Sequence, residues 1–116
     1  MKKRILAIDD ETMILDAMKV VFEEMDCEVS VFSDSAVGLE EALRGQYDLV
    51  LVDLRMPGKN GAEVAEQLLA KRPEAKVLVI TAHTDDPLAG RALRAGAVGL
   101  LRKPFEIARV LDFLKE

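Results

Sequence analysis

Polar side chains that can bind a metal ion or a phosphate follow four short apolar runs in this sequence. The runs and the side chains that follow them are 5–8 with Asp9 and Asp10, 49–52 with Asp53, 77–80 with Thr81, and 98–101 with Lys103. If the runs are strands of a parallel sheet, these side chains gather outside the carboxyl ends of the strands, where open α/β sheets bind their ligands. One edge of the sheet then holds three carboxylates, a hydroxyl and an amine.

Three carboxylates held close together repel one another, and their mutual field raises some of their pKa values. One lysine does not neutralise three acids, whereas Mg²⁺ takes oxygen ligands from carboxylates and often shares them with a substrate phosphate. The cluster therefore predicts a Mg²⁺ site, which Mn²⁺ could also fill, beside an anion pocket. A carboxylate in such a site can attack phosphorus to form an aspartyl phosphate. Mg²⁺, the Lys103 ammonium and the Thr81 hydroxyl would then neutralise the oxygens of the transferred group.

The elements that must hold these side chains alternate between strand-like and helix-like patterns. We expect strands at 5–8, 28–32, 49–53, 76–81 and 98–101, and helices at 11–25, from a cap at Ser33 or Asp34 to 44, and at 62–71, 87–95 and 106–114. The third and fourth strands are apolar without alternation, which is typical of a parallel sheet covered on both faces. The predicted fold is α/β: a doubly wound five-stranded parallel sheet in a flavodoxin-like three-layer sandwich. In the strand order 2-1-3-4-5, the first and third strands are neighbours and the three aspartates converge.

The composition limits the kind of protein that this chain forms. Its 116 residues suit one domain, 1–116, and its net charge of -5 argues against a nucleic-acid-binding domain. The single cysteine, Cys27, excludes an internal disulfide and suits a reducing cytoplasm. We interpret Cys27, like Met18 and Met25 of the first helix, as a packing residue. The first apolar run is too short for a signal peptide, and no stretch is long enough to span a membrane.

The polar side chains belong to short motifs that follow one another along nearly the whole chain. The motifs are Asp9-Asp10, the run from Asp53 to Pro57 with Gly61, Thr81-Ala82, Gly96-Ala97, and Lys103-Pro104-Phe105. No single motif is specific. Four of them in this order and at this spacing strongly resemble the receiver domain of two-component response regulators.

The resemblance implies a set of metal ligands. Asp10 would be a direct Mg²⁺ ligand and Asp9 would act largely through water. Asp53 and the backbone carbonyl oxygen of Arg55 would complete the ligands that the chain supplies.

The resemblance also implies how the phosphoryl group is handled. Asp53 would be the phosphoacceptor, and Lys103 would pair with Asp53 or with its phosphate. The Thr81 hydroxyl would bond the phosphoryl group and change position. The Lys103–Pro104 peptide bond would be cis, which is rare enough to indicate a shaped loop.

The function implied is that of a signalling switch. A histidine kinase or histidine phosphotransfer protein would donate a phosphoryl group to Asp53, and the domain would hydrolyse its own aspartyl phosphate slowly. It would have no external substrate and would therefore not be a conventional enzyme. We expect a cytoplasmic protein that acts on a downstream output domain or protein, as a monomer or a phosphorylation-dependent dimer, without direct binding to nucleic acid or insertion into a membrane.

One position departs from the family pattern. The residue three positions before Lys103 is usually Tyr or Phe, whose ring reports the state of the switch threonine, and here it is Leu100. The aromatic readout is therefore absent, although Thr81 can still move.

Three further hypotheses concern residues around the site. Ile14 is expected to be an exposed apolar residue that contacts the phosphoryl donor. Arg55 and His83 are expected to shield the attacking water at the pocket rim. The arginines of the C-terminal third form either a solvated face or a partner surface; they are Arg91, Arg94, Arg102 and Arg109.

Other interpretations stay open at this point. Taken singly, Asp9 and Asp10 could cap a helix and Asp53 could lie in a turn. A degenerate receiver would bind partners without taking phosphate. An Asp-dependent phosphohydrolase usually needs a second acid and a lid, for which we find no spare segment. A flavin-binding domain is disfavoured because the chain has no Trp and one Tyr.

Overall fold

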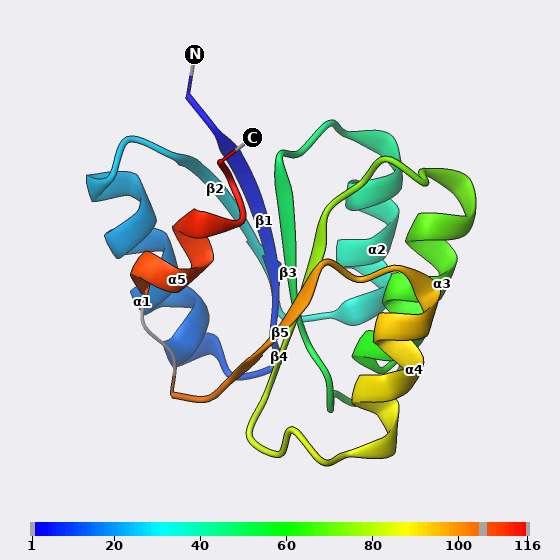
Figure 1. The fold of residues 1–116 in the computed structure, drawn as a ribbon. Coiled ribbons are helices and arrows are strands. Elements are labelled where there is room, and N and C mark those ends of the chain that lie inside the picture. Colours follow the sequence, from blue (N-terminus) through cyan, green and yellow to red (C-terminus); the bar gives the residue numbers. More distant parts are fainter. Residues whose placement is uncertain (1, 105–106, 116) are drawn as a thin grey trace.

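Five parallel strands form one sheet in the order β2-β1-β3-β4-β5, as predicted. The structure, a computed structural model, describes residues 2–104 and 107–115. The strands are β1 (Arg4–Ile8), β2 (Glu28–Phe32), β3 (Leu49–Asp53), β4 (Val77–Thr81) and β5 (Gly99–Arg102). The helices are α1 (Thr12–Glu24), α2 (Ser35–Arg44), α3 (Gly61–Lys71), α4 (Pro87–Ala95) and α5 (Ile107–Asp112). Helices α1 and α5 cover one face of the sheet, and α2, α3 and α4 cover the other (Figure 1).

The two faces of the sheet carry separate apolar clusters, because successive strand residues point to opposite sides. In β3, Val50 and Val52 pack in the cluster beneath α2, α3 and α4, whereas Leu49 and Leu51 pack in the cluster beneath α1 and α5. Both β3 and β4 are buried along their whole length. This burial on two sides explains why their sequences are apolar without alternation.

The register of the sheet brings the strand ends to one edge. Ile8 of β1 pairs with Val52 of β3, and Asp53 pairs with Ile80 of β4. Thr81, the last residue of β4, pairs with Arg102 of β5. Residues that follow these strands are therefore neighbours in space although they are far apart in the sequence.

Most element boundaries agree with the predicted ones to within two residues. The predicted strands 28–32 and 49–53 and the predicted helix 87–95 match the structure residue for residue. The fifth strand is Gly99–Arg102 rather than 98–101, because its parallel pairing with β4 starts at Gly99. The last helix is shorter than predicted, and Phe105 and Glu106 lie outside the described residues.

Local details decide one open alternative, confirm two predictions and correct one. Of the two possible caps of α2, Asp34 is the one used, since its carboxylate accepts from the backbone N–H of Ala36 and Val37. Met18 and Cys27 are buried as predicted. The prediction for Met25 is wrong: this residue is 46% exposed, and it lies just past the end of α1 at Glu24, as the C-cap of the helix.

Candidate functional site

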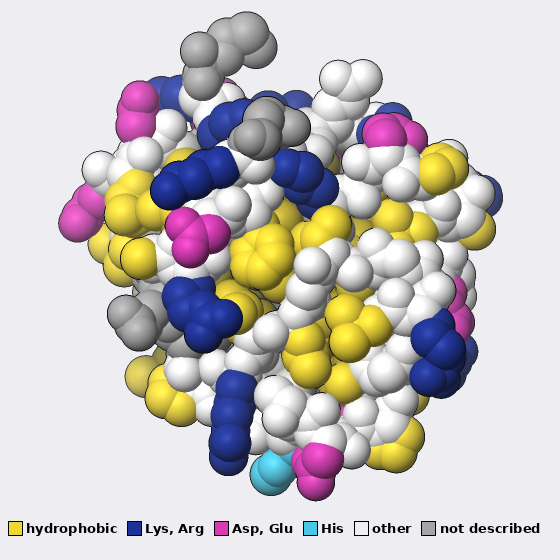
Figure 2. Space-filling view, in the orientation of Figure 1, with side chains coloured by type: hydrophobic (Ala, Val, Ile, Leu, Met, Phe, Trp, Pro, Cys, Tyr) yellow, Lys and Arg dark blue, Asp and Glu magenta, His cyan; other side chains and the backbone are white. Residues whose placement is uncertain are grey.

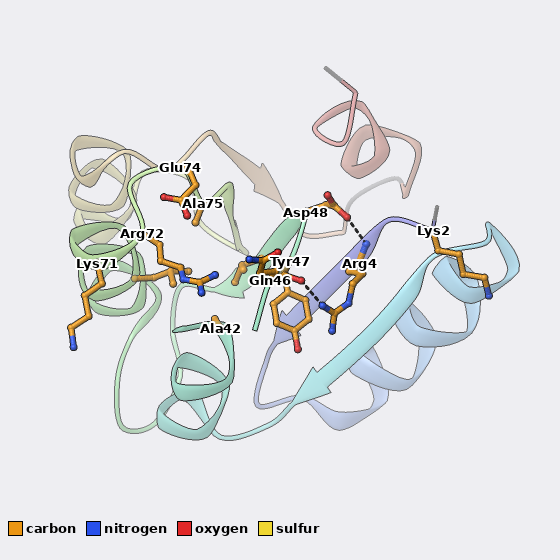
Figure 3. Close-up of a pocket in the computed structure, with 12 residues that line it drawn as sticks. Lys2, Arg4, Ala42, Gln46, Tyr47, Asp48, Lys71, Arg72, Glu74 and Ala75 are labelled. Atoms are coloured by element: carbon orange, nitrogen blue, oxygen red, sulfur yellow. Dashed lines mark hydrogen bonds between the residues drawn. The ribbon is translucent and has the colours of Figure 1, made fainter. Parts of the chain in front are cut away.

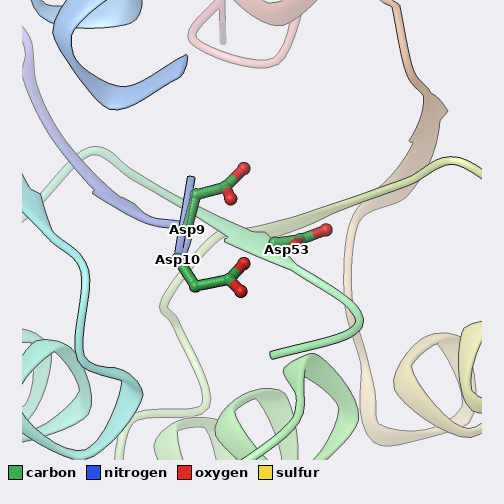
Figure 4. Close-up of side chains that lie close together, drawn as sticks. All are labelled: Asp9, Asp10 and Asp53. Carbon is green, nitrogen blue, oxygen red and sulfur yellow. The ribbon is translucent and has the colours of Figure 1, made fainter. Parts of the chain in front are cut away.

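Three carboxylates meet at the carboxyl edge of the sheet. Asp9 and Asp10 follow β1, and Asp53 is the last residue of β3 (Figure 4). Each contributes a carboxylate oxygen to a group whose members all lie within 4.8 Å of one another. Asp9 is fully buried and Asp53 is 6% exposed, whereas Asp10 is exposed. The group is therefore open to solvent mainly on the side of Asp10.

The Lys103 ammonium lies among these acids. Its Nζ is 3.0 Å from Asp9 Oδ2 and 3.3 Å from Asp53 Oδ1. It is also 3.2 Å from Oε1 of Glu11, whose backbone N–H donates to Asp9 Oδ1 at 2.9 Å. Sequence reasoning missed Glu11; its position directly after the Asp9-Asp10 pair was the available signal. Lys103 thus partly neutralises several carboxylates at once.

Burial perturbs the acids of this cluster. Burial and the negative charge of Asp9 raise the pKa of Asp53 to about 6, against the opposing charge of Lys103. Burial also raises the pKa of Asp9. Burial alone would lower the pKa of Lys103, but its hydrogen bond to Asp9 and the charge of Asp53 outweigh that effect and raise it. One ammonium therefore leaves the carboxylates incompletely stabilised.

A hard divalent cation fits this donor set. Mg²⁺ binds carboxylate and carbonyl oxygens, and it lowers the cost of holding several ionised acids together. Asp9, Asp10 and Asp53 offer such oxygens from adjacent chain segments.

The Thr81 hydroxyl is engaged with the chain that follows β4. Thr81 is buried, and its Oγ1 accepts from the backbone N–H of His83 at 3.1 Å and donates to the His83 carbonyl at 3.3 Å. The Thr81 carbonyl accepts from the backbone N–H of Lys103 at 2.7 Å. The Lys103–Pro104 peptide bond is cis, as predicted. The ends of β4 and β5 are therefore tied together beside the carboxylates.

The Arg55 side chain does not stand free at the pocket rim. Its guanidinium forms two hydrogen bonds with the carboxylate of Asp86, at 2.6 and 2.8 Å. The pairing fixes where this guanidinium lies, and its expected role as a shield against water stays a prediction. Sequence reasoning missed Asp86, although an aspartate directly before Pro87 is a recognisable helix-cap signal. His83 is exposed.

The loop between β3 and α3 requires glycine at its end. A Cβ on Gly61 would lie 2.6 Å from the carbonyl oxygen of Asp53. The Gly61 N–H donates to the Leu54 carbonyl, and Asn60 with Glu63 forms a capping box at the start of α3. The close approach of α3 thus depends on the glycine at position 61.

A cavity of about 630 Å³ lies elsewhere, at the opposite end of the strands (Figure 3). Its arginines already have partners, since Arg4 donates to the Gln46 carbonyl and Arg72 donates to the Gly45 carbonyl. The Arg4 guanidinium also lies over the Tyr47 ring. No carboxylate of the aspartate cluster lines this cavity, so the cluster is the better candidate for chemistry.

Comparisons with known proteins agree with this geometry. A family model described as the response regulator receiver domain matches residues 5–115. Over 114 residues the chain is 33% identical to the transcriptional regulatory protein FixJ of Bradyrhizobium diazoefficiens, a match that covers 98% of this chain and 56% of that protein. It is 30% identical over 111 residues to the response regulator protein TodT of Pseudomonas putida, covering 96% of this chain and 49% of TodT. The chain thus spans about half the length of these curated relatives.

Solved structures give the same result. A CheY-like receiver domain protein from Methanospirillum hungatei has a TM-score of 0.90 at 30% identity, over 97% of this chain and 90% of that one. The response regulator TrrA from Thermotoga maritima, in complex with Mg²⁺ and BeF, has a TM-score of 0.84 at 30% identity, over 97% and 99% of the two chains. Within the described residues, no helix combines the length and the apolar character needed to cross a bilayer.

Proposed function

This chain belongs to the family of response regulator receiver domains of two-component systems, and from that premise we propose that it accepts a phosphoryl group on Asp53 in a Mg²⁺-dependent reaction. Receiver domains of this family are signalling switches. The observation that carries the proposal is the position of Asp53: a nearly buried carboxylate, at a strand end, grouped with two other acids and 3.3 Å from an ammonium.

The metal would be held by side chains of the aspartate cluster. Asp10 and Asp53 would be direct ligands, Asp9 would act largely through water, and the Arg55 carbonyl would be a further ligand. When bound, Mg²⁺ (or Mn²⁺) would supply positive charge to the oxygens of the group in transfer. Burial raises the pKa values of Asp9 and Asp53, and a cation beside them would offset this cost of ionisation.

The chemical step would be an in-line displacement. An Asp53 carboxylate oxygen forms a bond to phosphorus while the bond from phosphorus to the donor's histidine nitrogen breaks, and that imidazole leaves with its electron pair. Lys103 would hold an oxygen of the transferred group. The Thr81 hydroxyl would donate to another oxygen after giving up its bonds with His83. Water would later cleave the aspartyl phosphate slowly, so the domain would turn over no external substrate.

The donor would be a phosphohistidine on a histidine kinase or a histidine phosphotransfer protein. Exposed apolar side chains on α1 support a protein contact there, since Met13 is 83% and Val20 is 56% exposed. Ile14, which was expected to be exposed, is only partly so and packs against the core. Met13 is therefore a better contact residue than Ile14.

The phosphorylated domain would act on a downstream output domain or protein, as a monomer or a phosphorylation-dependent dimer. Hydrophobic side chains gather over β5 between α4 and α5 (Figure 2). Leu93 on α4 and Val98, directly before β5, are large hydrophobic residues that are 44% and 43% exposed. This face supports a protein partner rather than nucleic acid. A cytoplasmic location is part of the proposal, because Cys27 is buried and unpaired, as suits a reducing compartment.

Phosphorylation with a small donor tests the proposal. The protein is incubated with acetyl phosphate and Mg²⁺, and its intact mass is measured. We expect the wild type to gain one phosphoryl group and Asp53→Asn to gain none, because the amide is not a nucleophile and keeps the volume of the side chain. Asp16→Asn, at an exposed position on α1, is the matched control and should be labelled like the wild type.

The outcome separates the alternatives. A degenerate receiver would show no gain in mass for any variant. Full labelling of Asp53→Asn would refute Asp53 as the acceptor. Continuous release of phosphate from a phosphomonoester, at a rate far above the decay of the labelled protein, would indicate a phosphohydrolase instead.

A further inference from the structure

A forked ion pair joins the loop after the phosphoacceptor strand to the start of α4. Arg55 Nε lies 2.6 Å from Asp86 Oδ2, and Arg55 Nη2 lies 2.8 Å from Asp86 Oδ1. Asp86 is also the N-cap of α4, because its Oδ1 accepts from the backbone N–H of Leu88 at 2.9 Å. The Asp86 side chain is only 8% exposed, whereas the Arg55 side chain is 66% exposed. The carboxylate is thus held within the fold, while the guanidinium that binds it lies at the surface.

The segment between β4 and α4 is held at both ends. At its start, the Thr81 hydroxyl bonds the backbone N–H and carbonyl of His83. At its end, Arg55 holds Asp86, whose N–H donates to the His83 carbonyl at 3.1 Å. A hydroxyl and a guanidinium are both groups that bind phosphoryl oxygens well. A phosphoryl group on Asp53 would therefore compete with His83 for the Thr81 hydroxyl and with Asp86 for the Arg55 guanidinium.

Polar contacts add to a small apolar interface in holding α4. Its buried residues are Ala89 and Ala92, two of the smallest side chains, and the partly buried Leu88 also packs against the core cluster. It packs on α3, where the guanidinium of Arg91 forms a second fork on Glu66 at 2.6 and 2.7 Å. Of these two forks, only the one from Arg55 starts two residues from the phosphoacceptor.

We propose that the Arg55–Asp86 pair is a phosphorylation-sensitive clamp on α4, an inference that rests on the proposed phosphorylation of Asp53. A phosphoryl group adds close to two negative charges and three strong acceptor oxygens. Arginine binds phosphate in the same forked geometry as carboxylate. The phosphoryl group on Asp53 draws the Arg55 guanidinium away from Asp86, while Asp86 stays in place as the cap of α4. The amino end of α4 is then released from the β3–α3 loop.

The clamp gives this chain a route from the phosphoryl group to α4 that needs no aromatic side chain on β5. The position that usually carries the ring is Leu100, which packs against the core cluster beneath α2, α3 and α4. Because Arg55 lies on the loop next to Asp53, its response does not depend on a rotation at position 100.

Hydrogen exchange of the whole chain, resolved at the amides of residues 88–91, tests the clamp. Wild type, Asp86→Asn and Glu66→Gln are measured before and after labelling with acetyl phosphate and Mg²⁺. Asparagine keeps the capping oxygen but removes the charge that Arg55 binds. Glu66→Gln is the matched control, because it weakens the other fork of α4 without touching Arg55.

We expect phosphorylation of the wild type to speed exchange at these amides about fivefold, the size expected for loss of one partly exposed ion pair. Asp86→Asn should exchange about fivefold faster before labelling and gain little more afterwards. Glu66→Gln should keep the full response to labelling. The Arg55 Nε–H signal in an NMR spectrum should move on labelling in the wild type and in Glu66→Gln.

Intact mass separates failure of the clamp from failure of phosphorylation. If the wild type gains the phosphoryl mass while exchange at 88–91 is unchanged, or if Asp86→Asn still responds fully, the clamp is refuted. If the wild type gains no phosphoryl mass, the proposed phosphorylation of Asp53 is refuted, and a clamp that responds to it is refuted as well. In that case, unlabelled Asp86→Asn that exchanges like the wild type also refutes the pair as a tether of α4.

Discussion

At the scale of single residues, Asp53 must be both a nucleophile and a buried group, and these requirements conflict. A carboxylate must be ionised to attack phosphorus. Burial and the charge of Asp9 nevertheless raise its pKa to about 6. Lys103 opposes this effect from 3.3 Å but shares its charge with Asp9 and Glu11. The conflict leaves the metal-free folded state less stable when Asp53 is ionised.

The raised pKa of Asp53 predicts how stability depends on pH. The folded state binds the Asp53 proton more tightly than the unfolded state, so ionisation destabilises the fold as pH rises through the interval from about 4 to about 6. The raised pKa of Asp9 acts in the same direction. Three other acids have lowered pKa values and stabilise the fold when they are ionised, an effect that is lost only at more acidic pH; they are Glu41, Glu66 and Asp86.

Thermal melts without metal test this dependence. The wild type should melt at a higher temperature at pH 5 than at pH 7.5, and Asp53→Asn should show a smaller difference. Asp16→Asn, at an exposed position, should behave like the wild type. A wild type that melts at the same or a lower temperature at pH 5 would contradict the assignment.

At the scale of elements, the start of α3 is pressed against the end of β3. The carbonyl oxygen of Asp53 lies only 2.6 Å from the position that a Cβ on Gly61 would take. Real Cβ atoms do not approach an oxygen this closely, so the helix or the strand end would have to shift. The loop with the phosphoacceptor therefore has little freedom to accept a side chain at position 61.

Gly61→Ala should lower stability by about 1–3 kcal/mol through overpacking and should also slow acetyl phosphate labelling. Gly90→Ala is the matched control: it lies inside α4, where a Cβ would meet only the flexible end of Arg94. Alanine there should stabilise the helix by about 0.5–1 kcal/mol. Urea unfolding measures both changes. If both substitutions changed the free energy of unfolding equally, the close approach of Gly61 to Asp53 would not be the cause of the lost stability.

Helix α1 carries the second prediction at this scale. Met13→Glu should slow transfer from a phosphohistidine donor at least tenfold, because it places a charge in an apolar contact that buries a large side chain. Acetyl phosphate needs no protein contact, so its labelling rate should change little. Val37→Glu is the control, since Val37 is similarly apolar and 53% exposed but lies on α2. Equal slowing with both donors would instead indicate damage to the site.

At the scale of the whole molecule, the packing of the core holds three mutually repelling carboxylates together, and their repulsion lowers the stability of the fold. The two apolar clusters hold β1 and β3 side by side, and this packing keeps Asp9, Asp10 and Asp53 together. A ligand that binds only the folded state raises its stability. Metal binding and removal of one acid should therefore both stabilise the fold, by the same electrostatic relief.

Asp10→Ala should raise the melting temperature without metal, by about 4–8 °C if the lost repulsion is about 1 kcal/mol. The negative charge of Asp10 contributes to the raised pKa of Asp53, which supports this sign. The variant should also lose the increase that Mg²⁺ produces in the wild type. Asp16→Ala is the control and should keep that increase. An unchanged Mg²⁺ effect in Asp10→Ala would exclude Asp10 as a ligand.

Local patterns were enough to predict the order of the elements and the meeting of the three aspartates. Apolar runs, helix caps and glycine stops act over a few residues, and parallel strands bring their carboxyl ends to one edge whatever the details of packing. The strands 28–32 and 49–53 could therefore be predicted residue for residue. The roles of Asp53, Thr81 and Lys103 remain predictions that their placement supports.

Only the tertiary structure decided the partners of Arg55 and Glu11. Arg55 finds Asp86 across 31 positions, and Glu11 finds Lys103 across 92. The exposure of Met25 likewise depends on where α1 ends relative to the core. Such contacts are set by the angle at which a helix or loop lies on the sheet and by side-chain rotamers. Neither leaves a periodic signal in the sequence, because long charged side chains can reach several partners from the same backbone position.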